Sequence, residues 1–430
     1  MRPPVGMTYG DYVTPFGYSL HYKVDGIGSE RILLVIGFAS SMDYWGGLVD
    51  AIHEKFPGRY TTCMYDQRGV GGSTCVLTEK CSSTTVARDI LGMLLHLNWV
   101  GKYIPLHLVS WSMGGFGSIE LINVLQSEFG STLNLASLTL CNTGHKFVLP
   151  AARSLVPGFS ALGKGILSLL LGIHPRWIIP EILRVHYSPK FLAVTNMYAK
   201  LYAEYETRSP FNAPIYRSVV PVFQHFYAVL THYVSKPRMK VIRECGLTMH
   251  AIIASEDLLI HPTASIQLAR SLGCPFSYFP GGHMSHVENT CEVLELLVRV
   301  WDEGLSRNFQ QFRTRGNAQM LRTLSMVNHP VGGDLLVTGS NIEWPEDIVS
   351  RLHALIATRM DRWGLRSLRN RLRQPGRLFI GPALILPILL IQLRKIVCFK
   401  QKTSKSIEVG LLVYVIVLIL LVQEVTREEG

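Results

Sequence analysis

Residues 106–117 read LHLVSWSMGGFG and carry the strongest structural signal in the chain. An apolar run typical of a buried strand enters a tight turn at Ser112, and a helix is expected to follow. In such a turn the residues two before and two after the central one must be small, and here they are Ser110 and Gly114. The turn lifts the Ser112 hydroxyl clear of the sheet, at the start of the helix. Because the helix dipole and the Met113 backbone N–H can stabilise negative charge there, Ser112 is a candidate nucleophile and Met113 a candidate oxyanion donor.

The loop after the apolar run of residues 31–36 offers a second oxyanion donor. It continues as Gly37-Phe38-Ala39. A glycine at this position lets the backbone approach the site closely, and the Phe38 N–H is then expected to point at the developing negative charge. A glycine that simply ends the strand is the structural alternative.

A serine nucleophile needs an acid and a base later in the chain, in that order. Residues 251–260 (AIIASEDLLI) form a candidate strand with two acids at its end. Asp257 is favoured over Glu256 because a proline follows it five residues on. The next strand ends in two glycines and His283, and the glycines let the loop turn so that the imidazole reaches Ser112. His286 is the competing base, although we expect it to open the final helix.

Residues 66–73 read DQRGVGGS, a glycine-rich turn that follows the apolar run of residues 60–65. Such a turn alone is compatible with phosphate binding. However, it lacks the Lys-Ser/Thr of a P-loop, so a nucleotide site is rejected. We interpret the turn as structural and near the site.

Strands alternate with helices along most of the chain, which predicts a doubly wound, mostly parallel sheet. The expected strands are residues 31–36, 60–65, 105–109, 135–141, 249–254 and 275–279, after two short strands around a turn at Phe16-Gly17. The expected helices are residues 42–55, 84–97, 116–125, 264–272 and 286–301. A helical, aromatic-rich stretch at about 146–243 interrupts this pattern. We interpret it as a cap over the site, whereas ordinary packing of an inserted helical bundle is the plainer alternative.

These features resemble the α/β-hydrolase superfamily over about residues 9–305. The resemblance rests on Gly37-Phe38, the turn at 66–73, Ser110–Gly114, Asp257 and Gly282-His283. It is strongest to esterases, monoacylglycerol lipases and lactonase-like enzymes with a helical cap. Two positions depart from the family pattern: Ile36 stands where a His is common, and Ser110 where the motif has Gly.

The resemblance implies a role for each residue of a catalytic triad. Ser112 is the nucleophile, His283 the general base and then acid, and Asp257 holds the imidazole in the useful tautomer. It implies neither a metal nor an organic cofactor. The expected domains are an α/β-hydrolase core (9–145 and 244–305), a helical cap (146–243), a basic and partly disordered linker (306–377), and an apolar C-terminal tail (378–423).

Basic residues are concentrated in two stretches of this chain, whose 430 residues have a formal net charge of +11. Residues 150–243 hold twelve Lys/Arg and three acids, and residues 351–377 hold eight Arg and one acid. Such stretches attract anionic partners. The sequence contains no recognisable nucleic-acid-binding module, and the apolar tail favours an anionic membrane surface as the partner.

The eight cysteines show no paired spacing. Cys63 and Cys141 lie in apolar runs, where a buried free thiol is expected. This pattern favours a reducing compartment. The first residues lack an apolar segment typical of a cleaved secretory signal.

Two apolar segments, residues 378–393 and 410–422, follow the arginine-rich stretch. Neither segment is long enough to be assigned on its own as a transmembrane helix. The 13 residues of the second segment rise only about 20 Å as a helix, whereas the hydrocarbon core of a membrane is roughly 30 Å thick. Burial against the hydrolase is the alternative. Since basic runs bracket the first segment, we expect membrane association, with the hydrolase domain facing the cytosol.

The sequence therefore predicts hydrolysis of a carboxylic ester through an acyl-enzyme. The aromatic insertion and the apolar tail favour a lipid-like ester as substrate. A membrane-tethered scaffold without activity and an acyltransferase using the same triad are the alternatives.

Overall fold

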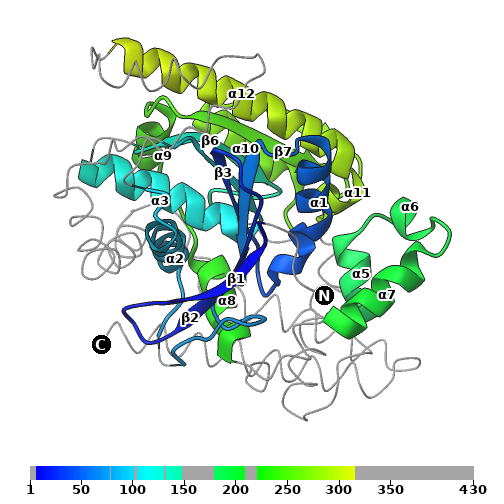
Figure 1. Ribbon diagram of the computed structural model, residues 1–430. Helices are drawn as coiled ribbons and strands as arrows, with labels where there is room; N and C mark the ends of the chain where they lie inside the picture. Colours follow the sequence, from blue (N-terminus) through cyan, green and yellow to red (C-terminus); the bar gives the residue numbers. More distant parts are fainter. Residues whose placement is uncertain are drawn as a thin grey trace, which may run out of the picture.

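A single sheet of eight strands forms the centre of the structure, a computed structural model that describes residues 6–77, 79–100, 104–129, 132–147, 179–208 and 220–314 (Figure 1). The strand order is β1-β2-β4-β3-β5-β6-β7-β8. The strands are β1 (Thr8–Val13), β2 (Ser19–Asp25), β3 (Glu30–Val35), β4 (Tyr60–Tyr65), β5 (Leu106–Trp111), β6 (Leu135–Cys141), β7 (Thr248–Ala254) and β8 (Phe276–Phe279). Only β2 pairs antiparallel, with β1 and with β4, and all other pairs are parallel. The predicted, mostly parallel sheet is confirmed.

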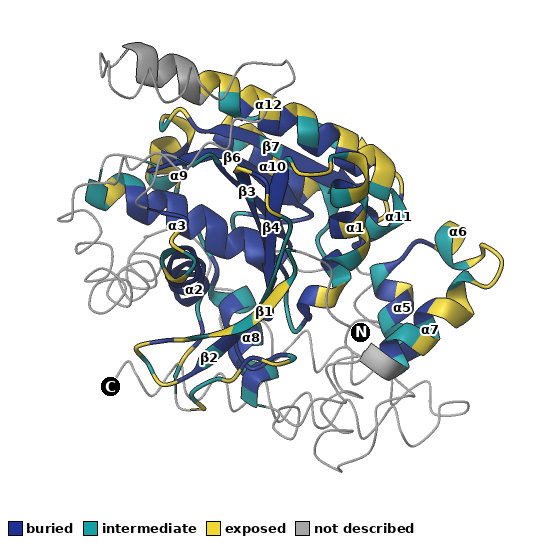
Figure 2. Ribbon diagram, in the orientation of Figure 1, coloured by how far each residue is buried: buried dark blue, intermediate teal, exposed yellow. Residues whose placement is uncertain are grey.

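Helices cover both faces of this sheet. They are η1 (Met42–Trp45), α1 (Gly46–Lys55), α2 (Ser83–His96), α3 (Met113–Phe129), α5 (Ile179–His186), α6 (Pro189–Leu192), α7 (Met197–Arg208), α8 (Val220–Thr231), α9 (Lys236–Arg243), α10 (Pro262–Leu272), α11 (Ser285–Glu288) and α12 (Thr290–Thr314). One apolar cluster includes side chains of α2, α3, α9 and α10, and a second includes side chains of α1, α5 and α12. In Figure 2 the central strands are mostly dark blue, whereas β1 and β2 are partly exposed and α1 and α12 turn exposed residues outward. The doubly wound arrangement therefore has a core on each side of the sheet.

Local sequence accounts for several of these elements. The central strands β4, β5 and β6 are buried along their whole length, as expected for apolar runs in a parallel sheet. Helix α2 begins with a capping box between Ser82 and Thr85. Helix α10 begins with a proline and ends at Gly273, whose φ of +67° is the left-handed conformation that glycine adopts readily.

The insertion between β6 and β7 contains α5 to α9, which pack in two places. Helices α5 and α7 contribute to the apolar cluster that includes α1. By contrast, α9 packs on α3 and α10 through Met239 and Ile242, which are buried in the opposite cluster. The stretch expected to form one unit thus contacts both faces of the fold, and its residues 148–178 and 209–219 lie outside the described residues.

Helices α11 and α12 differ from the sequence-based predictions in two respects. Helix α12 runs to Thr314, so residues 306–314 are helical and do not begin a linker. An ion pair of 2.6 Å between Glu303 and Arg307, one helical turn apart, lies across the expected boundary. The predicted final helix at 286–301 is also two helices, with His286 inside the short α11.

The expected linker beyond residue 314 and the apolar tail at 378–423 lie outside the described residues. In the part of the chain that is described, no helix is long and apolar enough to cross a membrane. The seven described cysteines are free thiols, and Cys63 and Cys141 are buried as predicted.

Candidate active site

Ser112 occupies a strained turn between β5 and α3. Its φ of +55° lies in the left-handed region, which costs about 1–3 kcal/mol for a residue with a side chain. The surrounding structure holds this conformation: the Ser112 N–H donates to the Cys141 carbonyl at 2.9 Å, and the Thr143 hydroxyl donates to the Ser112 carbonyl at 2.7 Å. Cys141 is the last residue of β6 and Thr143 lies just after it, so the end of the neighbouring strand fixes the turn.

Close packing explains why the residues around Ser112 are small. A Cβ on Gly114 would lie 2.5 Å from the Val35 carbonyl oxygen, and a Cβ on Gly37 would lie 2.9 Å from the Ser112 Cβ. Ser110 carries a hydroxyl where the family motif has glycine, and this group is buried and 2.6 Å from the Ser118 hydroxyl. The departure at position 110 is therefore accommodated by a hydrogen bond to α3.

Asp257 and His283 form a hydrogen-bonded pair at the ends of β7 and β8. The His283 Nδ1 lies 2.7 Å from Asp257 Oδ2. The other carboxylate oxygen accepts the backbone N–H groups of Leu259 at 2.8 Å and Ile260 at 2.9 Å. These contacts hold the carboxylate against the imidazole, whereas Glu256 is exposed. Because the carboxyl ends of parallel strands meet at one edge, the pair lies at the same edge as Ser112.

The three residues are nearly buried: Ser112 is 8% exposed, Asp257 2% and His283 2%. The Trp111 ring, next to Ser112 in the chain, lies 4.8 Å from the His283 ring between centroids. No hydrogen bond joins Ser112 to His283 among the described residues. Catalytic hydrogen bonds often tighten only when substrate binds.

Asn142 is a site residue that sequence reasoning missed. It follows β6 with a φ of +47°. Its amide nitrogen donates to the His283 carbonyl at 2.8 Å and its amide oxygen accepts the Ala254 N–H at 2.7 Å, so it ties the histidine loop to the end of β7. The Trp111 indole N–H donates to the same His283 carbonyl at 2.8 Å. An asparagine directly after a predicted strand was the only available signal.

Glu288 is a second residue that was missed. Its carboxylate accepts the Gly282 N–H at 2.8 Å, and it also accepts the backbone N–H of Ser188 at 2.9 Å and the Ser188 hydroxyl at 2.6 Å. Glu288 therefore joins the histidine loop to the start of α6 in the insertion. Nothing in the local sequence marks this long-range contact.

His286, the competing base, makes no hydrogen bond to Asp257. It is 1% exposed and its ring packs 4.6 Å from the Trp45 ring. Burial lowers the pKa of His286 to about 3, and the nearby His283 acts in the same direction. Neither ring nitrogen of His286 has a hydrogen-bond partner within 3.5 Å among the described residues. His286 is thus a neutral, buried ring, and His283 is the histidine bonded to Asp257.

The two candidate oxyanion donors belong to segments that adjoin Ser112. Met113 is the first residue of α3, and the loop holding Phe38 is the one whose Gly37 lies against Ser112. The Phe38 carbonyl accepts the Ser40 hydroxyl at 2.9 Å, and Ala39 has a φ of +46°. Like Ser112 and Asn142, Ala39 is a non-glycine residue with positive φ, which indicates a loop held in one conformation by its neighbours.

The turn at 66–73 is structural, as predicted. Asp66 accepts the Met42 N–H at 2.7 Å and the Gly72 N–H at 2.8 Å. Burial raises the pKa of Asp66 to about 6, against the effect of these two backbone donors. Gln67 donates to the Ile36 carbonyl at 2.9 Å, so this turn supports the loop that carries Phe38.

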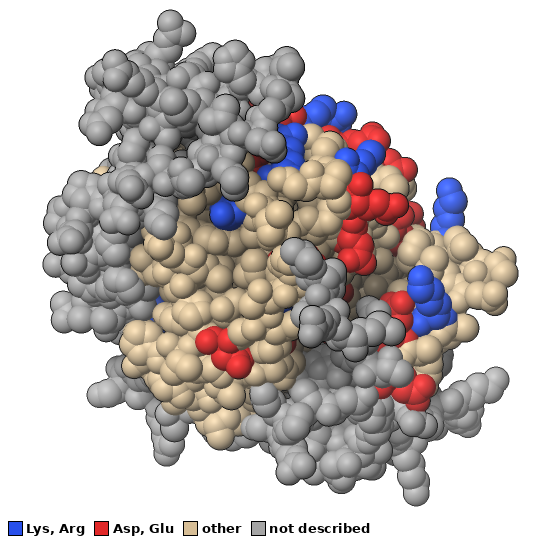
Figure 3. All heavy atoms as spheres, viewed as in Figure 1, with Lys and Arg blue, Asp and Glu red and all other residues tan. Residues whose placement is uncertain are grey.

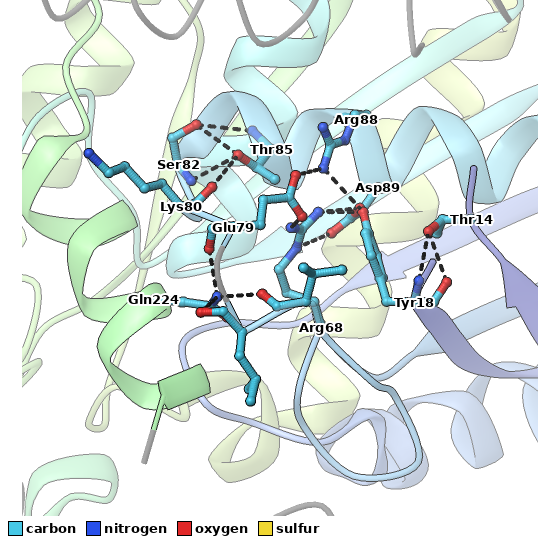
Figure 4. A network of polar contacts seen from close by, with 12 residues as sticks. Thr14, Tyr18, Arg68, Glu79, Lys80, Ser82, Thr85, Arg88, Asp89 and Gln224 are labelled. Atoms are coloured by element: carbon cyan, nitrogen blue, oxygen red, sulfur yellow. Dashed lines mark hydrogen bonds and ion pairs between the residues drawn. The ribbon is translucent and has the colours of Figure 1, made fainter. Parts of the chain in front are cut away.

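Arg68 of this turn lies in a buried charge network (Figure 4). It is 2% exposed and donates to both carboxylate oxygens of Asp89, at 2.8 and 2.7 Å. It also contacts Glu79 at 2.9 Å, and Glu79 pairs with Arg88. Burial opposes the charged guanidinium, but Asp89 and Tyr18 hold the pKa of Arg68 well above its ordinary value. The network fixes the turn and leaves no charge unpaired within it.

Charge on the molecular surface is mixed on the face drawn in Figure 3. Acidic and basic side chains lie together along the edge where α12 and α1 run, and most of the remaining described surface on that face is uncharged. The arginine-rich residues 351–377 lie outside the described residues. In the described ranges, no group of three or more His, Cys, Asp or Glu is placed to hold a metal ion.

Comparisons with known proteins agree with this architecture. The family model described as "Alpha/beta hydrolase family" matches residues 32–296. The "Putative carbamate hydrolase RutD" of Acinetobacter baylyi is 21% identical over 281 residues, which cover 65% of this chain and 97% of the relative.

Solved structures show the same fold. A thermophilic esterase from Thermogutta terrifontis has a TM-score of 0.52 and 18% identity, over 69% of this chain and 99% of that one. An enol-lactonase from Burkholderia xenovorans has a TM-score of 0.51 and 17% identity, over 69% of this chain and 100% of that one. At these identities the likeness concerns the fold alone.

Proposed function

The chain belongs to the alpha/beta hydrolase family and is therefore a hydrolase. We propose that it cleaves a carboxylic ester through an acyl-enzyme on Ser112. One observation carries this proposal: the Asp257–His283 pair, 2.7 Å apart, lies at the same sheet edge as the strained Ser112 turn. A carboxyl group, an imidazole and a projecting hydroxyl in this order are the parts of a serine nucleophile and its base.

The geometry supports a definite role for each group. Asp257 accepts the Nδ1–H of His283, which leaves Nε2 as the proton acceptor. The Ser112 oxygen attacks the ester carbonyl as Nε2 takes its proton, and the carbonyl oxygen becomes an oxyanion. The Phe38 and Met113 N–H groups are the proposed donors to that oxyanion. His283 then protonates the leaving alcohol, and water releases the acid by the same steps in reverse.

Aromatic rings near the triad support the proposal of a lipid-like acyl group. The Tyr44 ring lies 6.4 Å from the Trp111 ring and 5.5 Å from the ring of Tyr205, which belongs to α7 of the insertion. We propose on this basis that the insertion caps the site and offers an apolar surface to the acyl chain. The relatives named above as an esterase, a lactonase and a carbamate hydrolase act on different carbonyl compounds, so the acyl preference has to be measured.

A series of p-nitrophenyl esters from acetyl to octanoyl tests the acyl preference. Each methylene buried in an apolar site contributes about 0.8 kcal/mol, which is roughly a fourfold rise in kcat/KM before the series levels off. A flat series, or a preference for charged acyl groups, would count against a lipid-like substrate.

We further propose that the apolar segments at 378–423 attach the chain to a membrane with the hydrolase domain in the cytosol. Two apolar segments bracketed by basic runs support this placement. Fractionation of the full-length chain tests it. Full-length protein that leaves the membrane fraction on carbonate or high-salt treatment without detergent would contradict the proposal.

Labelling with a fluorophosphonate probe tests the proposed chemistry. We expect the full-length chain to be labelled and Ser112→Ala to lose the label. Ser110→Ala is the matched control, because Ser110 lies two residues away but its hydroxyl is buried against Ser118. It should keep the label. Label that persists in Ser112→Ala, or that disappears only in Ser110→Ala, would overturn the assignment of the nucleophile.

A further inference from the structure

We propose that His225, in helix α8 of the insertion, is a positioning residue that holds the oxyanion loop of residues 36–41 in its working conformation. This inference rests on the proposed function, because it assigns a role to a loop that acts only when an oxyanion forms. His225 lies far from the triad in sequence and touches no reacting atom.

The hydrogen bonds of His225 define its tautomer. Its Nδ1 accepts the Ala39 N–H at 3.0 Å, and its Nε2 lies 3.0 Å from the Arg68 carbonyl oxygen. A carbonyl can only accept, so Nε2 carries the hydrogen and Nδ1 is the bare acceptor. The ring is 0% exposed, and it meets the Phe38 ring in an edge-to-face arrangement with 6.0 Å between centroids. His225 therefore connects the oxyanion loop with the turn at 66–73.

The bond with Ala39 requires a neutral imidazole, whereas the bond with Arg68 does not. A protonated ring would point an N–H at the Ala39 N–H, so that two donors would face each other. Burial lowers the pKa of His225 to about 4, and the charge of Arg68 acts in the same direction. Near neutral pH the ring is thus in the form that can accept from Ala39.

The contact with Ala39 matters because it orients the peptide group next to the proposed donor. The Phe38–Ala39 peptide is held at both ends, since its carbonyl accepts the Ser40 hydroxyl and its N–H donates to His225. Fixing this peptide limits the rotation of Phe38 and so sets the direction of the Phe38 N–H. Ala39 keeps a φ of +46°, a conformation that the loop is expected to leave once the bond is lost.

Helix α8 has other anchors that do not touch the oxyanion loop. The Gln224 side-chain amide donates to the carbonyls of Val76 at 2.8 Å and Glu79 at 2.6 Å (Figure 4). Pro221 packs against Gly69 so closely that a Cβ on that glycine would lie 2.5 Å from the proline. The position of α8 and the position of the loop can therefore be perturbed separately.

Two amide variants separate the two bonds of His225. The Asn oxygen in His225→Asn takes the place of Nδ1 and can accept from Ala39, whereas the longer Gln in His225→Gln reaches toward Arg68 and leaves Ala39 without an acceptor. Gln224→Met is the matched control, because it removes the α8 anchors and keeps the contact with Ala39. Steady-state hydrolysis of p-nitrophenyl butyrate gives kcat and KM, and thermal unfolding reports folding of each full-length variant.

Loss of one oxyanion donor lowers kcat by about 10²–10³-fold in serine hydrolases. We therefore expect His225→Gln to lose about 100-fold in kcat with KM within threefold, and His225→Asn to recover at least tenfold of that loss. Gln224→Met should keep kcat within threefold of wild type, even if it unfolds at a lower temperature. Equal kcat in the two His225 variants, or a loss in Gln224→Met as large as in His225→Gln, would overturn this inference alone. A wild-type chain that neither takes up the fluorophosphonate nor hydrolyses the ester would overturn the proposed function, and this inference with it.

Discussion

Replacing His286 with Phe removes a buried ring that titrates but makes no normal hydrogen bond among the described residues. The aromatic contact with Trp45 can be kept, because Phe has a similar shape. At pH 7 the imidazole is neutral in both the folded and the unfolded chain. We therefore expect the free energy of unfolding at pH 7 to change by less than about 1.5 kcal/mol, as for other conservative core substitutions.

At acidic pH the stabilities of wild type and His286→Phe are expected to differ. The ordinary pKa of 6.5 describes His286 in the unfolded chain, and burial lowers it to about 3 in the fold. Below pH 6.5 the unfolded chain binds a proton that the folded chain does not, so stability is lost as the pH falls from about 6.5 toward 3. At pH 5 this difference is about 1.36 × 1.5, or about 2 kcal/mol, for this one residue.

Urea unfolding of both full-length proteins, followed by tryptophan fluorescence at pH 7 and pH 5, measures this difference. Wild type should lose about 2 kcal/mol more than His286→Phe between the two pH values. His286→Phe should also keep its esterase activity at pH 7, because His283 is the ring bonded to Asp257. Equal losses in the two proteins would refute the buried neutral ring, and an inactive but folded variant would mean that the wrong histidine has been assigned as the base.

Two further substitutions test the acid of the triad and the buried network. Asp257→Asn keeps the shape of the acid but not its charge, so kcat should fall by about 10⁴-fold while the melting temperature stays within a few degrees; a loss below tenfold would contradict the role of Asp257. Asp89→Leu leaves the guanidinium of Arg68 without its bidentate partner in a buried place, and breaking such a pair costs about 3–5 kcal/mol. Chemical denaturation measures that loss, and a change below about 1 kcal/mol would show that Glu79 and Tyr18 are sufficient partners for Arg68.

Strand ends explain how much of the site the sequence could predict. Ser112, Asp257 and His283 each follow an apolar run, and parallel strands bring such ends to one edge. The pattern thus predicts that the three residues meet, and the structure joins Asp257 to His283 directly. The choice between Asp257 and Glu256 rested on spacing, and the structure places Asp257 inward and Glu256 in solvent.

Long-range side-chain contacts explain what was missed. Asn142, His225 and Glu288 act on loops that lie far away in sequence, at separations of 141, 186 and 100 residues for the contacts that matter here. No periodicity or local motif encodes such pairs, because they depend on tertiary packing: of two core loops for Asn142, and of the insertion against the core for His225 and Glu288. Helix α12 also continues past the predicted boundary at 305, because residues 306–314 extend a helix whose earlier turns contribute to an apolar cluster on the sheet.

A trapped acyl-enzyme tests the central claim most directly. The full-length chain is mixed with p-nitrophenyl butyrate, quenched in acid within the first turnover, digested and examined by mass spectrometry. We expect a butyryl group on the peptide that contains Ser112, and no such group in Ser112→Ala treated in the same way. Release of p-nitrophenol by the wild-type chain with no acyl group on that peptide, or equal turnover by Ser112→Ala, would contradict this claim.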